Sequence, residues 1–327
     1  MARLLPVSVL VSGALAGCSF CMPGRSYVTS PPALSVEEAV ARDRLRTHVF
    51  ELAEKIGERN LVHSDGLERA RDYVAAELRL AGHAVSILPF THRGTTFHNV
   101  EAVLPGRVAS DRSVVVGAHY DSVDGSPGAN DNASGVAALL EVARTLAQRP
   151  SALTIRFVAF ANEEPPYFNT GEGMGSVEYA KQLDDPARTV RAMLSLETVG
   201  YYSESPGSQH YPSIVGWFYP DRGNFIAFVG NLASRSVLRT AIRTFRDSAT
   251  LPSEGAMLPA FIPGVAWSDH RSFWDAGVPA VMVTDTAPFR DPRYHTAMDS
   301  PERLDYERMA RLVTGTVRVV EALASDE

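Results

Sequence analysis

The strongest constraint on the fold is an alternation of short apolar runs with longer amphipathic stretches. The runs Ser113–Ala118, Leu153–Asn162 and Ala280–Thr284 have the length and apolar content of buried strands. Helical patterns separate such runs, for example from Ala133 to Ala147. Strands that alternate with helices favour parallel pairing. The sequence therefore predicts an α/β fold: a three-layer sandwich in which helices flank a mixed, mostly parallel central sheet.

The same criteria locate the remaining elements. Ser35 and Glu38 form a capping box that predicts a helix start, and Gly57 predicts its end. Further helices are expected at 67–81, near 177–183, in the region 224–245 and at 301–324, and further strands at 85–90, 96–104 and 191–197. No internal repeat or boundary divides residues 36–327, so they are expected to form one domain.

The first residues differ in composition from the rest of the chain. Arg3 precedes an apolar run from Leu4 to Ala16, which is too short to span a bilayer but suits a secretory signal. The run ends in a segment that resembles the bacterial lipobox, Leu15-Ala16-Gly17-Cys18, where cleavage precedes a lipidated cysteine. Residues 1–17 are therefore predicted as a lipoprotein signal peptide and residues 18–35, rich in Ser and Pro, as a tether. Cleavage elsewhere nearby, which would leave Cys18 as a plain thiol, is the alternative.

This interpretation places the protein in the bacterial cell envelope, on its periplasmic or extracellular side. The lipid on Cys18 is the expected contact with the membrane. The formal net charge is −7 and no long basic run is present, so nucleic acid is not an expected partner. Cys18 and Cys21 are the only cysteines, so a bound zinc ion must use His, Asp and Glu, and no disulfide is expected. The sequence gives no oligomeric state.

Histidines and carboxylates collect where the predicted strands end. His119 and Asp121 follow one strand, the pair Glu163-Glu164 follows another, and Glu197 ends a third. Ligands of α/β folds bind at the carboxyl ends of the strands. Two adjacent buried carboxylates repel each other, so a metal ion is the simplest compensation for the stretch ANEEPPY.

Four motifs carry a resemblance to a known family. They are HYD at 119–121, GANDNASG at 128–135, NEE at 162–164 and YHTAMD at 294–299. Together they resemble the co-catalytic zinc exopeptidases, which include bacterial leucine aminopeptidases, plasma glutamate carboxypeptidase and glutaminyl cyclases. The resemblance covers residues 85–327 and implies a metallo-aminopeptidase with peptide substrates.

The resemblance implies two zinc ions per chain, held by His119, Asp131, Glu164, Glu197 and His295. Asp131 would bridge both ions, because one carboxylate can span two cations and relieve their repulsion. His119 and Glu197 would complete one ion, and Glu164 and His295 the other.

The remaining roles also come from the resemblance. Glu163 would be the general base that takes a proton from a metal-bridging water, so it must not be a ligand. Asp121 would hydrogen-bond the other nitrogen of His119, and the peptide between Asp131 and Asn132 would be cis.

One position departs from the family pattern. Well-known aminopeptidases of this family have Asp where this chain has Glu197. If Glu197 is only a charged residue at a strand end, one metal remains, as in glutaminyl cyclases. A mono-zinc cyclase or a carboxypeptidase is thus the alternative enzyme. A catalytically silent peptide-binding lipoprotein is the non-enzyme alternative.

Other residues receive weaker interpretations. Asp269 and His270 resemble a family motif and are expected near the site but not as ligands. Asp285 could either orient His295 or cap a turn. No G-x-S-x-G motif supports a serine hydrolase.

Overall fold

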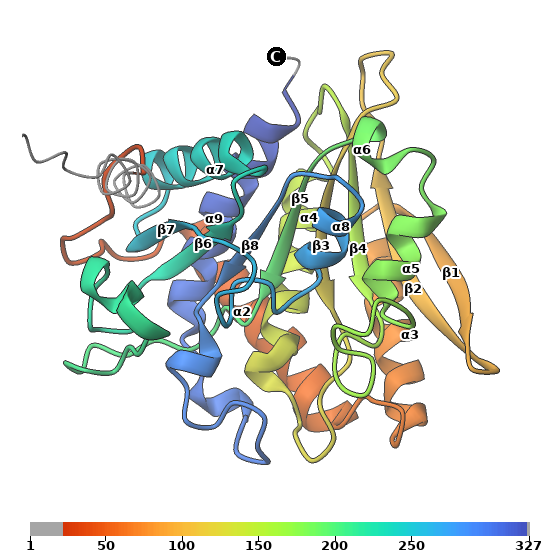
Figure 1. Cartoon of the computed structure of the whole chain (residues 1–327), viewed down its shortest axis with the longest axis horizontal. Coiled ribbons are helices and arrows are strands. Elements are labelled where there is room, and N and C mark those ends of the chain that lie inside the picture. Colours follow the sequence, from red (N-terminus) through yellow and green to blue (C-terminus); the bar gives the residue numbers. More distant parts are fainter. Residues whose placement is uncertain (1–21, 326–327) are drawn as a thin grey trace, which may run out of the picture.

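A computed structural model describes residues 22–325 of the 327-residue chain (Figure 1). The predicted signal peptide, both cysteines and the first residues of the predicted tether lie outside the described residues. No helix within the described range is both long and apolar enough to cross a membrane.

An eight-stranded mixed sheet forms the centre of the fold, in the order β1-β2-β4-β3-β5-β8-β6-β7. The strands β4, β3, β5 and β8 lie side by side and run parallel, whereas β1, β2 and β6 introduce antiparallel pairs. The strands are β1 (Ala84–His92), β2 (Thr95–Leu104), β3 (Ser113–His119), β4 (Thr154–Phe160), β5 (Val190–Glu197), β6 (Ile226–Gly230), β7 (Ser253–Met257) and β8 (Ala280–Thr284).

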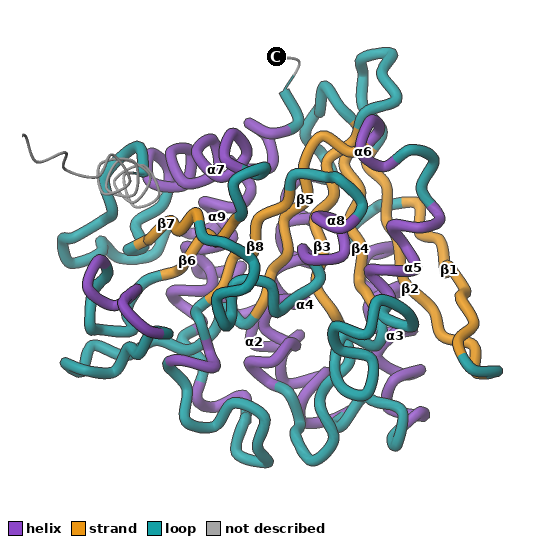
Figure 2. The backbone as a smooth tube through the Cα atoms, viewed as in Figure 1, coloured by secondary structure: helices purple, strands orange, loops and turns teal. Residues whose placement is uncertain are grey.

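Helices cover both faces of the sheet, which confirms the predicted three layers (Figure 2). Side chains of β3 alternate between the layers: Val114 and Val116 pack in the larger apolar cluster and Val115 in the smaller one. The larger cluster holds side chains of α2 (Val36–Phe50), α3 (Ser64–Leu80), α4 (Gly135–Leu146), α7 (Arg235–Ser248) and α9 (Tyr306–Leu323). The smaller cluster holds Tyr179 of α5 (Gly175–Gln182) and Phe273 of α8 (His270–Asp275). The short α6 (Pro186–Thr189) leads into β5.

The first described helix starts and stops as predicted. Ser35 Oγ accepts a hydrogen bond from Glu38 N at 3.1 Å, and Glu38 Oε2 accepts one from Ser35 N at 3.0 Å. The helix continues as a wider turn through Glu51–Ile56 and ends at Gly57, whose φ is +82°. The final helix is shorter than predicted: a 3-10 turn at Pro301–Arg303 precedes α9.

The prediction of helix across the region 224–245 is wrong in its first part. Ile226–Gly230 forms β6, and α7 begins only at Arg235. A short apolar run has no periodicity that separates a buried strand from a buried helix, which explains the error. The strand β7 was not predicted, because its sequence SEGAM contains a glycine and a glutamate, which are uncommon in strands.

Part of the segment predicted as a tether contacts the domain. Ser253 N of β7 donates a hydrogen bond to Ser26 Oγ at 2.8 Å. Arg246 Nη1 of α7 donates to the carbonyl oxygen of Pro23 at 3.1 Å. Met22 lies so close to Gly255 that an added Cβ there would be 2.7 Å from its Cγ. The described chain therefore begins against β7 and α7.

Candidate metal centre

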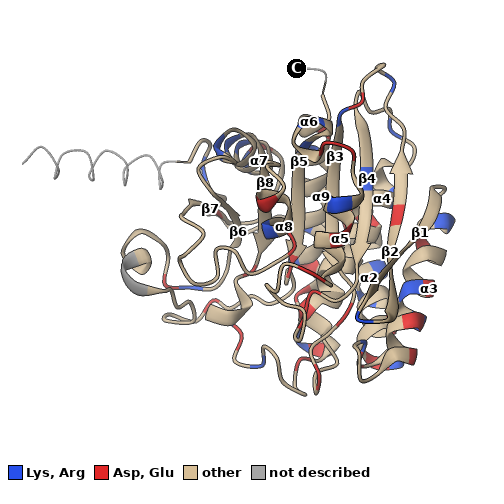
Figure 3. Ribbon diagram, turned by 45° about the vertical axis from the view of Figure 1, so that its right-hand side comes forward, with Lys and Arg blue, Asp and Glu red and all other residues tan. Residues whose placement is uncertain are grey.

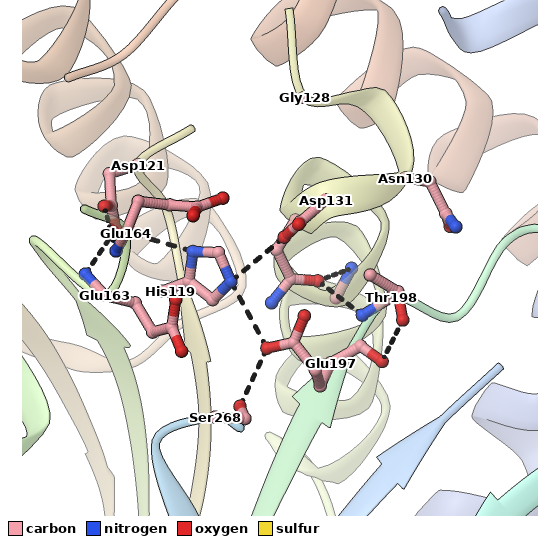
Figure 4. Close-up of polar contacts among 12 residues, drawn as sticks. His119, Asp121, Gly128, Asn130, Asp131, Glu163, Glu164, Glu197, Thr198 and Ser268 are labelled. Carbon is pink, nitrogen blue, oxygen red and sulfur yellow. Dashed lines mark hydrogen bonds and ion pairs between the residues drawn. The ribbon is translucent and has the colours of Figure 1, made fainter. Parts of the chain in front are cut away.

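The candidate site lies at the carboxyl ends of three neighbouring parallel strands (Figure 4). His119 is the last residue of β3, and Glu197 is the last residue of β5. Glu163 and Glu164 follow β4 after a turn in which Asn162 has a φ of +60°. Because these strands are adjacent and parallel, their ends bring residues that are distant in sequence to one place.

The two other predicted ligands come from loops above the sheet. Asp131 lies in the turn Ala129–Ser134 that leads into α4, and His295 lies in the loop after β8. The peptide between Asp131 and Asn132 is cis, as the resemblance implied. His295 has a φ of +59°, so the loop backbone turns sharply at this residue.

The structure brings all five predicted ligands together in two groups that share Asp131. The first group is His119, Asp131 and Glu197, and the second is Asp131, Glu164 and His295. Within each group the potential ligand atoms lie within 4.8 Å of one another.

The two oxygens of Asp131 face different groups. Asp131 Oδ1 lies 3.3 Å from His119 Nε2, and Asp131 Oδ2 lies 3.0 Å from His295 Nε2. His119 Nε2 is also 3.3 Å from Glu197 Oε2, and His295 Nε2 is 3.3 Å from Glu164 Oε1. Asp131 therefore takes part in both groups, with a different oxygen in each.

The chemistry of these groups fits bound metal ions. Both ring nitrogens of His119 and Oε1 of Glu164 are buried and have no hydrogen-bond partner. Native proteins rarely leave such atoms unpaired. Asp131, Glu164 and Glu197 are all buried, and their mutual repulsion is costly without a cation. Imidazole and carboxylate donors are those that zinc binds in the absence of thiolates.

Glu163 is buried beside the two groups but belongs to neither. Burial raises the pKa of Glu163 well above its usual value, and the neighbouring carboxylates of Glu197 and Glu164 raise it further. Glu163 also lines a cavity together with Asp131 and His295. A carboxylate with a raised pKa that belongs to neither group is suited to accept and release a proton.

Asp121 supports the site differently from the predicted contact. Its Oδ1 lies 3.4 Å from His119 Nδ1, on the predicted side of the ring. The stronger contacts of Asp121 are to the backbone: Oδ1 accepts from Glu163 N and Oδ2 from Glu164 N, each at 3.1 Å. Asp121 therefore fixes the turn that carries both glutamates.

Asp299 and Asn130 position the loop of Asp131, a role that the sequence did not indicate for either residue. Asp299 accepts hydrogen bonds from Asn130 N at 2.8 Å and Asp131 N at 3.1 Å. Asn130 Nδ2 donates to Asp285 Oδ2 at 2.9 Å. Asp285 thus supports the loop that carries Asp131. It forms no hydrogen bond with His295 among the described residues, so the expected orientation of His295 by Asp285 is not observed.

Ser268 holds Glu197, the residue that departs from the family pattern. Ser268 Oγ donates to Glu197 Oε2 at 2.7 Å and lies 3.0 Å from Ser195 Oγ of the same strand as Glu197. The next residue, Asp269, is fully buried, and burial raises its pKa to about 7. Asp269 belongs to neither ligand group, as expected.

A buried arginine, Arg59, which no sequence motif indicates, joins the loops around the site. The guanidinium of Arg59 donates to the carbonyl oxygens of Tyr120, Pro127 and Gly128, and also to those of Leu52 and Gly57. Burial lowers the pKa of Arg59 to about 10, and Asp121 opposes this change, so the side chain stays charged at neutral pH. Arg59 thereby ties the end of the first helix to the loops that hold Asp121 and Asp131.

A second, apolar cavity adjoins the site. It shares Glu197, Trp267 and Tyr294 with the cavity that holds Glu163. The cavity is lined by side chains of β6, β7 and β8 and by side chains of the loops 209–219 and 258–267. Apolar side chains provide most of its wall: Val215, Phe225, Val229, Leu258, Ile262, Met282 and Phe289.

The chain is similar in sequence to known peptidases. Residues 99–320 match the model of Peptidase family M28. The uncharacterized protein YfbL of Escherichia coli is 37% identical over 287 residues, which cover 85% of this chain and 87% of YfbL. Aminopeptidase YwaD of Bacillus subtilis is 30% identical over 220 residues, 65% of this chain but 42% of YwaD. Leucine aminopeptidase 1 of Arthroderma otae is 29% identical, and the chain spans 57% of its length.

Solved structures share the fold at low sequence identity. BSAP, a zinc aminopeptidase from Bacillus subtilis, superposes with a TM-score of 0.68 at 17% identity, over 88% of this chain and 95% of BSAP. The glutaminyl cyclase of Tannerella forsythia superposes with a TM-score of 0.62 at 20% identity, over 86% of this chain and 98% of the cyclase.

Proposed function

Because the chain belongs to peptidase family M28, we propose that it is a zinc-dependent exopeptidase that releases amino acids from the N-terminus of peptides. The observation that carries the proposal is the pair of ligand groups that share Asp131, with the unshared carboxylate of Glu163 beside them. The non-enzyme alternative is less well supported, because no residue of this set is missing.

The residues that would hold the metal follow from the two groups. His119, Asp131 and Glu197 would hold one zinc ion, and Asp131, Glu164 and His295 the other. When bound, zinc ions would polarise the scissile carbonyl and make a water molecule more acidic.

Glu163 would move the proton during hydrolysis. Its carboxylate would accept a proton from the attacking water as the new carbon–oxygen bond forms. Glu163 would then give this proton to the leaving nitrogen as the carbon–nitrogen bond breaks, so the carboxylate is regenerated in each turnover. The backbone contacts of Asp121 would keep Glu163 in place for both steps.

The adjoining cavity suggests which substrates are preferred. Its apolar wall begins at Glu197 and Tyr294, next to the ligand groups. A peptide whose first residue has a large apolar side chain could bury that side chain there. We therefore expect leucine, methionine and phenylalanine to be released faster than aspartate or glycine.

The test of the function combines metal analysis with a substrate panel. Zinc per chain is measured together with release of amino acids from aminoacyl amides, with and without a chelator. Two zinc ions and chelator-sensitive release are expected. One zinc ion, no release and cyclisation of N-terminal glutamine would instead favour a glutaminyl cyclase, and an absence of metal and of both activities would favour the binding protein.

We also propose that the protein is exported and lipidated at Cys18, from the sequence of residues 1–18. In the bacterial host, Cys18→Ser should move the protein from the detergent-extracted membrane fraction to the soluble fraction. An unchanged distribution after fractionation would contradict lipidation at this residue.

A further inference from the structure

The helix α7 carries a stripe of positive charge. Its sequence, RSVLRTAIRTFRDS, contains four arginines and one acidic residue, Asp247. Arg235, Arg239, Arg243 and Arg246 lie four, four and three residues apart, so they fall within about 80° of the helix circumference. Figure 3 shows basic residues gathered on α7, in a chain whose formal net charge is −7.

Two of the four arginines, Arg235 and Arg243, face outward, and Arg239 is half-buried between them. The buried side chains of α7 lie on another side of the helix, at Val237, Leu238, Ala241, Ile242 and Phe245. Arg235 and Arg243 are exposed, and neither forms an ion pair with any residue in the described part of the chain. Arg246 differs, because it donates to Ser253 O and Pro23 O. We call Arg235, Arg239 and Arg243 the α7 basic face.

The described chain begins beside this face. A Cβ added to Gly24 would lie 3.2 Å from Arg246 Cβ and 3.8 Å from Arg243 Cα. Arg25, which follows it, is exposed and adds a further positive charge nearby. Cys18 is only four residues before Met22, a distance that an extended chain spans in about 14 Å. A lipid on Cys18 would therefore hold α7 close to a bilayer.

The start of α7 lies away from the candidate site. β6 runs antiparallel to β8, so its last residue, Gly230, lies beside the start of β8. This is the end of the strands opposite to the one that carries His119 and Glu197. Leu232, between Gly230 and α7, is 68% exposed and offers an apolar side chain at this end. A surface bound here would leave the candidate site open to solution.

We propose that the α7 basic face binds the headgroups of an anionic lipid bilayer. Arginines near such a surface are attracted by its negative potential. A bilayer is the expected partner because the proposed lipid on Cys18 would hold α7 near one. The binding of the α7 basic face to headgroups needs neither that lipid nor peptidase activity.

The test uses residues 22–327, which contain every described helix and strand. This protein lacks Cys18 and therefore carries no lipid. Co-sedimentation is measured with phosphatidylcholine vesicles with and without phosphatidylglycerol, at low and high salt. The variant replaces the α7 basic face by Arg235→Gln, Arg239→Gln and Arg243→Gln. A matched control removes three exposed arginines outside α7, by Arg79→Gln, Arg107→Gln and Arg112→Gln. Thermal unfolding verifies that each protein is folded.

The parent should bind the anionic vesicles in a salt-sensitive manner and should not bind phosphatidylcholine alone. The partition coefficient of the α7 variant should fall on the order of 100-fold, and that of the control by less than about threefold. Equal binding to both vesicles, unchanged binding of the α7 variant, or an equal loss in the control would each overturn the proposal. An equal loss would mean that net charge, and not this face, governs binding.

Discussion

At the scale of single residues, two adjacent glutamates have different surroundings. Glu164 belongs to a ligand group with Asp131 and His295, whereas Glu163 does not. Glu163→Gln should therefore retain the metal and lose activity by about 10²- to 10⁴-fold, because the amide cannot accept the proton of water. Zinc content and kcat are the two measurements.

The matched control for this prediction is Glu172→Gln, which changes an exposed glutamate in the loop that follows. It should leave both quantities unchanged. Near-parental kcat in Glu163→Gln with full zinc content would contradict the role of Glu163 in proton transfer.

Ser268 allows a test of how Glu197 is held. Ser268→Ala removes the hydroxyl that donates to Glu197 Oε2. We expect zinc affinity at one of the two positions to fall about 10- to 100-fold, as is usual when a ligand loses its support. Competition with a chelator measures this affinity, and Ser236→Ala, at an exposed position of α7, is the control. Equal affinities in all three proteins would show that Ser268 does not position a ligand.

The sequence predicted the residues with metal-binding chemistry more readily than their supports. His119, Glu163, Glu164 and Glu197 stand next to apolar runs, and this local signal identifies them. Ser268 and Asp299 act on partners 71 and about 170 residues away, so only the folded chain relates them to the site. Asp299 belongs to the motif YHTAMD, but neither residue type indicates which group it supports.

At the scale of elements, Arg59 connects the first described helix to the loops of the site. Arg59→Met leaves the carbonyl oxygens of Tyr120 and Pro127 without their donor, whereas that of Gly128 keeps the backbone N–H of Ala133. Each buried unsatisfied group costs about 1–3 kcal/mol, so the free energy of unfolding should fall by roughly 2 kcal/mol or more. Urea unfolding measures the loss, and Arg42→Met on the half-exposed side of α2 is the control. A change below about 1 kcal/mol would mean that other contacts hold these loops.

The elements themselves were predicted unevenly, for physical reasons. The strand β8 was predicted with its observed bounds, because four apolar residues and Thr284 precede the polar loop. The pair β6 and β7 was missed or misassigned, because β6 has no alternation and β7 has weak strand propensity. Pairing with β8 and packing on α7 stabilise this part of the sheet, and neither contact is local in sequence.

At the scale of the whole molecule, the buried His270 makes the fold sensitive to acid. Its Nε2 donates to Val265 O at 2.8 Å, and burial lowers its pKa to about 4 from the ordinary 6.5. The unfolded chain therefore takes up a proton below about pH 6.5, whereas the folded chain does so only near pH 4. The stabilising contribution is complete above pH 6.5 and is lost as the pH falls toward 4, by about 3 kcal/mol in all.

The measurement is the free energy of unfolding in urea at several pH values between 7 and 4. His270→Gln keeps a donor for Val265 and cannot take up a proton, so its unfolding free energy should fall less steeply with acid. His210→Gln, at an exposed position, should follow the parent. Identical pH slopes for the parent and His270→Gln would remove His270 as the cause.

The segment that begins at Met22 has one more consequence for the molecule. β7 is a terminal strand of the sheet, and such strands can recruit an identical strand from another copy and so begin aggregation. Ser26 already occupies the backbone N–H of Ser253, and Met22 covers Gly255. Residues 22–26 thus protect this edge of the sheet from self-association. A protease that trims them would leave the candidate metal site untouched and yet yield a protein that precipitates.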